Sequence, residues 1–258
     1  VITFHNRIKQ AENFSNNLKD LMDRLSHKEG IPADRWMQHI SGNMSAGDRS
    51  NLLTQFRNQD KGVGVLSNAR CLNEGVDVPS IDGVAFIEPR RSNIEIVQAV
   101  GRAIRKGQGD KVGTILLPVF IDEDEDHELA LSQSRFEPIW AVLKALRQHD
   151  EILADELDHL RYTLGRRGGI SGEWPGKIII DLPELVGEEF VDALRTRVVE
   201  TSTASWEFCL GLLQAYVDEN GDAFVPSGHT TLEGHKLGKW VDNQRNRWER
   251  LTPERIER

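Results

Sequence analysis

The chain has 258 residues, of which 38% are hydrophobic and 28% charged, and its formal net charge at pH 7 is −9. This is ordinary for one or two folded domains, and the acidic balance excludes a uniformly basic nucleic-acid binder, so any nucleic-acid surface must be local. Two cysteines in dissimilar contexts give no disulfide framework, and no apolar run is long enough to span a bilayer, so we expect a cytoplasmic protein without a membrane partner.

Short apolar strands alternate with helices over the first 121 residues. Strands are expected at residues 1–4, 36–40, 63–66, 84–87 and 114–119, and helices at residues 8–25, 46–59 and 93–106. Apolar residues recur every three to four positions in the first of these helices, a period that buries one helix face on a sheet. The alternation predicts βαβ units and a parallel sheet, and therefore an α/β domain over residues 1–125.

A connector is expected at residues 126–200. An acidic run at residues 122–128 spans its start, and a solvated hinge or helix start is favoured there over a metal site. The connector is predicted to be mostly helical, with a short strand at residues 177–183 and a helix at residues 186–200. Its function cannot be read from its residues, and no metal site is expected.

The last segment, residues 203–258, is predicted to form a small helical bundle. Between Lys236 and Arg250 there are five basic residues against two acidic ones, with Trp240 and Trp248 among them. Both tryptophans either pack the bundle core or stack on bases, and the sequence leaves this open. The better candidates for contact with nucleic acid are the basic side chains, namely Lys239, Arg245 and Arg247.

Two arginines stand one helical turn apart in the expected helix at residues 93–106. Gln98, Gly101, Arg102 and Arg105 fall along one face of that helix, because residues three and four apart are neighbours. Guanidinium groups are always charged and donate in a fork to phosphate oxygens. The segment therefore indicates a phosphate site, against the alternative of a solvated basic helix face.

A polar loop follows the expected strand at residues 63–66. Gly75 in this loop permits a positive φ or a close approach of the backbone to a ligand, and the Asp77 carboxylate can bind a hydroxyl or a cation. Loops at the carboxyl ends of parallel strands are where α/β folds bind ligands. This loop is thus a second candidate for the same site.

The order of these blocks resembles the second motor domain of superfamily 2 DEAD/DEAH-type helicases. Residues 67–79 are similar to motif V, residues 98–105 to motif VI, and residues 1–7 to motif IV, while residues 39–45 match the segment between motifs IV and V. Residues 203–258 resemble a helicase-associated domain, through the turn at 220–226 and the helix that follows it. The resemblance covers residues 1–121 and this last segment.

The resemblance implies a RecA-like parallel sheet flanked by helices, followed by a helical region and a C-terminal bundle. It also implies ATP and Mg²⁺ as cofactors, bound in a cleft between two motor domains. Arg102 and Arg105 would act on the γ-phosphate as arginine fingers, while Gly75, Asp77, Gln98 and Gly101 would contact the nucleotide. A further set of residues would contact the phosphate backbone of one nucleic-acid strand: His5, Asn6, Arg7, Ser41, Gly42, Ser67 and Asn68.

The sequence has no Gly-x-x-x-x-Gly-Lys-Ser/Thr loop, and we expect the magnesium-binding Asp-Glu box of this family to lie on the first motor domain. The chain alone is therefore expected not to hydrolyse ATP. It begins without methionine inside an expected strand, and we expect it to be a C-terminal portion that works with an N-terminal motor domain. The leading hypothesis is a monomeric bacterial helicase or translocase, acting on DNA rather than RNA. The alternatives are the motor of a restriction-modification system and a non-enzymatic nucleic-acid-binding module.

Overall fold

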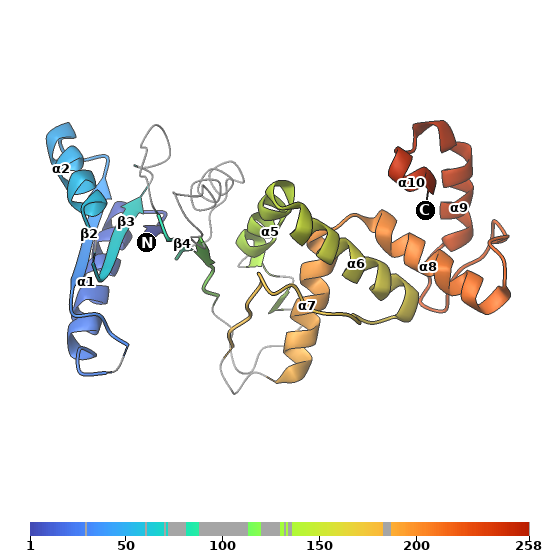
Figure 1. Cartoon of the computed structure of the whole chain (residues 1–258), viewed down its shortest axis with the longest axis horizontal. Coiled ribbons are helices and arrows are strands. Elements are labelled where there is room, and N and C mark those ends of the chain that lie inside the picture. The colour runs from blue at the N-terminus through green and yellow to red at the C-terminus, as the bar shows by residue number, and fades with distance from the viewer. Residues whose placement is uncertain are drawn as a thin grey trace. The chain divides into compact units, whose positions relative to one another are not determined.

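The structure is a computed structural model, and it describes residues 1–28, 30–59, 61–69, 71, 81–87, 113–119, 130–131, 133, 136–182 and 187–257. The chain forms two compact units, Val1–Leu146 and Arg147–Arg258. Their elements are labelled in Figure 1.

The first unit is built on a parallel sheet whose strands lie in the order β2-β3-β1-β4-β5. Every residue of β1 and β4 is buried, as expected for parallel strands. Because all pairs are parallel, the carboxyl ends of the strands share one edge. The predicted α/β fold with a parallel sheet is confirmed. The strands are β1 (Ile2–Phe4), β2 (Arg35–Ser41), β3 (Val63–Ala69), β4 (Gly83–Phe86) and β5 (Thr114–Leu116).

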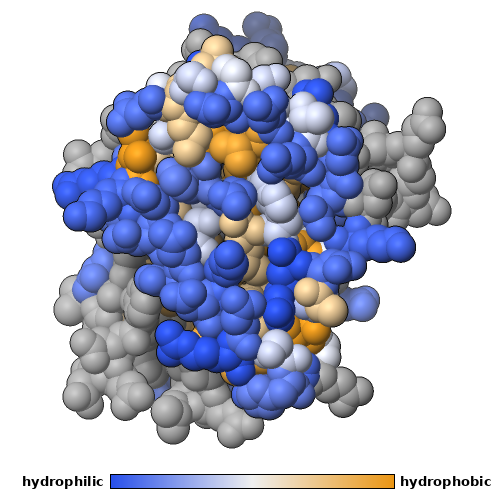
Figure 2. All heavy atoms as spheres, turned by 90° about the vertical axis from the view of Figure 1, so that its left-hand side faces the viewer, coloured by the Kyte–Doolittle hydropathy of each residue, from blue (hydrophilic) through white to orange (hydrophobic). Residues whose placement is uncertain are grey.

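Two helices of this unit follow their strands as expected. Helix α1 (Ile8–Arg24) packs against β2 and β3 and presents a polar outer face. Helix α2 (Ala46–Arg57) is capped by Ser45, whose Oγ accepts from the Asp48 N–H at 3.1 Å. In the space-filling view of the side where α1 and α2 lie (Figure 2), hydrophilic residues predominate and hydrophobic ones form small separate patches. The helix expected at residues 93–106 lies outside the described residues.

The core of the first unit includes residues from beyond the expected domain end. Strand residues such as Ile2, Ile40 and Phe86 pack together with Val142 and Ala145. The last two belong to helix α5 (Glu137–His149) and are almost fully buried. Burying such apolar side chains stabilises the fold by roughly 1.5–3 kcal/mol for a large aliphatic residue. The first unit therefore continues to Leu146, past the boundary expected at residue 125.

The second unit is helical, and its two main helices approach with their backbones almost in contact. A Cβ added to Gly165 of α6 would lie 2.0 Å from the Phe208 carbonyl oxygen, and one added to Gly211 of α8 would lie 2.1 Å from the Tyr162 carbonyl oxygen. The helices are α6 (Glu151–Arg167), α7 (Glu188–Ser202), α8 (Ser205–Asn220), α9 (Leu237–Asn246), the 3₁₀ helix η2 (Trp248–Arg250) and α10 (Pro253–Glu257). Because α6 precedes the expected boundary near residue 200 and α8 follows it, that boundary falls inside one compact unit.

A short strand was expected at residues 177–183. Residues 177–182, which the structure describes, do not form it. The backbone instead turns, with the Ile178 N–H donating to the Pro175 carbonyl at 2.9 Å. The Trp174 indole N–H donates to the Ile178 carbonyl at 2.8 Å, and Ile179 is 87% exposed. Local partners thus take the hydrogen bonds that a neighbouring strand would have provided, and the strand prediction was wrong.

Candidate functional site

Three of the predicted nucleic-acid segments begin side by side at the carboxyl edge of the sheet. Strands β1 and β2 both pair with β3, so that Phe4 and Ile40 lie beside Asn68. The His5 N–H extends this pairing by donating to the Asn68 carbonyl at 2.9 Å. The residues at the ends of these three strands are therefore close in space, as their resemblance to helicase motifs implied.

Some of these side chains point into the protein. Thr3 Oγ1 donates to Ser67 Oγ at 3.0 Å and is also hydrogen-bonded to His5 Nε2 at 3.0 Å. The His5 ring also packs on Phe14, with centroids 4.9 Å apart, and only 1% of His5 is exposed. This buried network holds β1 to β3 and does not face a ligand at the surface.

Ser41 and Asn68 are buried as well, at 3% and 0% exposure. The Asn68 side-chain oxygen accepts from the Cys71 N–H at 2.9 Å and so fixes the start of the loop after β3. Of the residues predicted to contact a phosphate backbone at this edge, His5, Ser41, Ser67 and Asn68 therefore have side chains inside the protein. In this structure they position the loops that carry the exposed residues.

Asn6, Arg7 and Gly42 are exposed at the same edge. Arg7 is the N-cap residue of α1, no side chain caps this helix, and its first turn contains no acidic residue. A helix N-terminus attracts anions, and a neighbouring guanidinium adds a full positive charge. Arg49 Nη1 donates to the Gly42 carbonyl at 3.3 Å and fixes that loop. The arrangement is chemically suited to a phosphate group.

The predicted ATP-contacting residues Gly75, Asp77, Gln98, Gly101, Arg102 and Arg105 lie outside the described residues. The described strands nevertheless fix where their segments start. Strand β3 ends at Ala69 and β4 at Phe86, and both strands pair with β1 in parallel. The two segments thus leave the sheet at the same edge, on either side of β1.

The predicted basic residues of the C-terminal bundle lie in different places around α9. Arg245 Nη2 donates to the Ala223 carbonyl at 3.1 Å, whereas Lys239 is exposed on the helix. Arg247 follows the helix and lines a pocket. Trp240 packs partly into the bundle core, while Trp248 is 56% exposed and is not a core residue.

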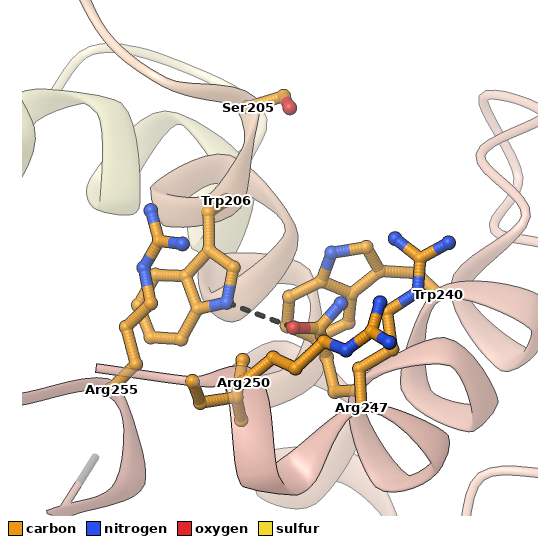
Figure 3. A pocket seen from close by; sticks show the side chains of 8 residues that line it. Ser205, Trp206, Trp240, Arg247, Arg250 and Arg255 are labelled. Carbon is orange, nitrogen blue, oxygen red and sulfur yellow. Dashed lines mark hydrogen bonds between the residues drawn. The ribbon is translucent and has the colours of Figure 1, made fainter. Parts of the chain in front are cut away.

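The pocket that Arg247 lines has a volume of about 370 Å³, and we call it the Trp240 pocket. Figure 3 shows its side chains. Sequence reasoning identified only two of its members, Trp240 and Arg247. The available signal was helical spacing, since Gln244 stands one turn after Trp240 on the same face. The pocket is lined by Ser205, Trp206, Trp240, Gln244, Arg247, Arg250, Leu251 and Arg255.

Ion pairs elsewhere in the second unit stabilise helices. Hydrogen bonds from the Gln214 amide and then from the Arg166 guanidinium hold the pKa of the Asp218 carboxyl below its usual value, and Arg166 Nε lies 2.8 Å from that carboxyl. This pair connects α6 to α8.

Burial raises the pKa of the Cys209 thiol, which makes it a weak nucleophile at neutral pH. We assign these groups to the scaffold.

Among the described residues, no group of three His, Cys, Asp or Glu side chains is placed to hold a metal ion. The acidic run at residues 122–128 lies outside them. Nor does any helix in the described part of the chain have the length and apolar character to cross a membrane.

Two protein-family models match the chain. The helicase conserved C-terminal domain matches residues 1–107, and the helicase associated domain matches residues 203–258. These segments are the ones whose motifs showed the resemblance, so the predicted family relationship is confirmed.

Relatives are similar over part of the chain. The Fanconi anemia group M protein homolog of Mus musculus is 24% identical over 147 residues, 55% of this chain and 7% of that protein. A Methanocaldococcus jannaschii protein that carries the name of an ATP-dependent RNA helicase is 32% identical over 102 residues, 38% of this chain and 13% of that protein. The chain thus spans a small part of the length of these relatives.

One solved structure is similar over nearly the whole chain. It is the ATP-dependent Type ISP restriction-modification enzyme LlaBIII bound to DNA. The match covers 93% of this chain and 17% of that enzyme's chain, with a TM-score of 0.62 and 22% identity. At this identity the similarity concerns the fold, and it confirms the RecA-like α/β architecture with a helical C-terminal region.

Proposed function

Because the chain carries the C-terminal motor domain of a superfamily 2 helicase followed by a helicase-associated domain, we propose that the full-length protein is an ATP-dependent helicase or translocase. The chain would supply half of the ATP site and part of the track for the nucleic acid. An N-terminal motor domain would bind most of the ATP and its Mg²⁺. Hydrolysis would then change how the two motor domains meet and move the strand stepwise.

Arg102 and Arg105 are the proposed catalytic groups of this chain. Two guanidinium groups at the γ-phosphate would stabilise the charge of the transition state, an effect worth ~10³–10⁵ in rate for arginine fingers. The parallel register of β1, β3 and β4 supports this site, because it starts both ligand segments at one edge. The proposed nucleotide-contacting residues remain Gly75, Asp77, Gln98 and Gly101.

The proposed track for the nucleic acid has an exposed part in each unit. Asn6, Arg7 and Gly42 contribute in the first unit, beside the start of α1. Lys239, Arg245 and Arg247 contribute in the second. DNA is the proposed polymer, since the similar restriction-modification enzyme was solved bound to DNA.

The observation that carries this proposal is the match of residues 1–107 to the helicase C-terminal domain. The test is ATP hydrolysis by the full-length protein with and without single-stranded DNA. We expect stimulation by DNA, and we expect the 258-residue chain alone to be inactive. Absence of hydrolysis in the full-length protein, or turnover by the chain alone, would contradict the proposal.

A second candidate is the motor of a restriction-modification translocase. It is favoured by the extent of the fold similarity, which includes the connector and the C-terminal bundle. Such a protein would translocate along DNA, and its cleavage of DNA would depend on the methylation state of a recognition site. Cleavage assays on methylated and unmethylated DNA with the full-length protein would separate the two candidates. A non-enzymatic nucleic-acid-binding module is disfavoured because Arg102 and Arg105 are both present.

A further inference from the structure

The Trp240 pocket combines aromatic rings with guanidinium groups in one small cavity. Trp240 and Gln244 stand one turn apart on α9, and Arg247 follows at the end of that helix. The chain then turns through η2, which places Arg250 at the same opening. Figure 3 shows the side chains of Arg247 and Arg250 reaching toward the Trp240 ring.

The two arginines at the opening are available to an anion. Arg247 and Arg250 are exposed, and within the described residues neither has a carboxylate at ion-pair distance. By contrast, Arg166 in the same unit is paired with Asp218. A guanidinium without a carboxylate partner keeps its full donor capacity, and its planar fork matches phosphate oxygens.

The aromatic rings have different roles. Trp206 is only 9% exposed, its indole N–H donates to Gln244 Oε1 at 3.2 Å, and the Arg255 guanidinium lies 4.8 Å from its ring centroid. The Trp206 ring is therefore held in one position and forms one side of the pocket. The Trp240 ring lies 6.2 Å from it, tilted by 58°, and is only half-buried. Trp240 is thus the ring that a flat ligand can reach.

We propose that the Trp240 pocket binds one unpaired nucleotide of a nucleic-acid strand. The base would lie against Trp240, and the adjoining phosphates would contact Arg247 and Arg250. A volume of about 370 Å³ is at the lower end for ligand pockets and suits a single nucleotide. A paired base has no free face for stacking, so single strands are preferred over duplex. This inference rests on the proposed function and locates one contact of its track.

The test is binding of a fluorescent oligothymidylate to the 258-residue chain, measured by anisotropy over a series of salt concentrations. Arg247→Gln and Arg250→Gln each remove one phosphate contact and should lower the salt slope by about 0.7. Trp240→Leu should weaken binding about 5- to 150-fold through lost stacking. Trp240→Phe keeps an aromatic face and should lose less. Arg197→Ala on α7 removes the same charge away from the pocket and serves as the control.

The outcomes separate the pocket from the wider function. Normal binding by Arg247→Gln, Arg250→Gln and Trp240→Leu, or an equal loss in Arg197→Ala, would overturn the pocket while leaving a nucleic-acid-binding chain. No binding of the oligonucleotide by the wild-type chain would overturn both. Equal affinity for free thymidine monophosphate would reassign the pocket to a free nucleotide, and equal affinity for duplex would exclude base stacking. Thermal unfolding by circular dichroism identifies a Trp240 variant that fails to fold, in which case the two arginine variants decide.

Discussion

At the scale of single residues, the polar groups at the carboxyl edge of the sheet divide into buried and exposed sets. The sequence was sufficient to place them at strand ends, because apolar strands can be recognised by their composition. It could not show that the side chains of His5 and Ser67 are both hydrogen-bonded to Thr3, since this depends on the register between β1 and β3. A prediction from the polar character of the residues alone therefore included side chains that are buried, such as those of His5 and Ser67.

Among the described residues at this edge, Arg7 is an exposed cation, and its replacement tests that distinction. We expect Arg7→Ala to weaken binding of a single-stranded oligonucleotide and to lower the salt slope by about 0.7, because one phosphate contact is lost. Lys9→Ala removes the same charge from an exposed position in α1. Titration of both variants at several salt concentrations checks this. An identical slope in the two variants would remove Arg7 from the track.

At the scale of elements, the crossing of α6 and α8 explains why the connector and the C-terminal bundle form one unit. The sequence predicted helical structure in both segments but separated the segments into different domains. A glycine inside a helical pattern signals only lower helix propensity. Its use in a close approach, as at Gly165 and Gly211, requires the partner helix to be known.

Replacement of either glycine should destabilise the second unit. In Gly165→Ala the added methyl group would meet the Phe208 carbonyl, and we expect a loss of roughly 1–3 kcal/mol in the free energy of unfolding. Gly169→Ala is the matched control, because no atom lies within 4 Å of its added Cβ. Urea denaturation followed by circular dichroism measures both. Equal midpoints would show that the helices can separate at little cost.

The start of α6 gives stability that depends on pH. Hydrogen bonds from Lys177 and from the Leu153 N–H lower the pKa of the Asp150 carboxyl, and Lys177 Nζ lies 2.5 Å from it. A lowered pKa in the folded state contributes stability above the unfolded pKa of about 3.9, which is lost as pH falls through the folded pKa. Asn caps a helix about as well as Asp, so Asp150→Asn isolates the charge.

We therefore expect Asp150→Asn to cost about 0.2–1 kcal/mol at pH 7 and progressively less below about pH 4. Unfolding free energies of the two proteins across this range provide the measurement. A difference that stays constant with pH would mean that the carboxylate charge contributes nothing.

At the scale of the whole molecule, the order of motifs was more informative than composition. Net charge alone argued only against a uniformly basic nucleic-acid binder. The strand-helix alternation predicted the parallel sheet, and the motifs predicted both family matches. The connector was predicted less well, because residues 177–182 of its strand-like run form no strand and the Trp174 indole N–H instead binds the Ile178 carbonyl. Apolar β-branched residues favour a strand only where a partner strand is present.

The central claim is that this chain supplies arginine fingers to an ATP site. Its most direct test is steady-state ATP hydrolysis by the full-length protein, with Arg102→Ala and Arg105→Ala compared with Lys19→Ala, which removes an exposed charge from α1. We predict that each arginine variant loses ~10³ or more in kcat while its affinity for single-stranded DNA stays close to that of the wild type. Arg102→Lys should not restore the rate, because an ammonium lacks the fork geometry. Unchanged turnover in either alanine variant would contradict the account.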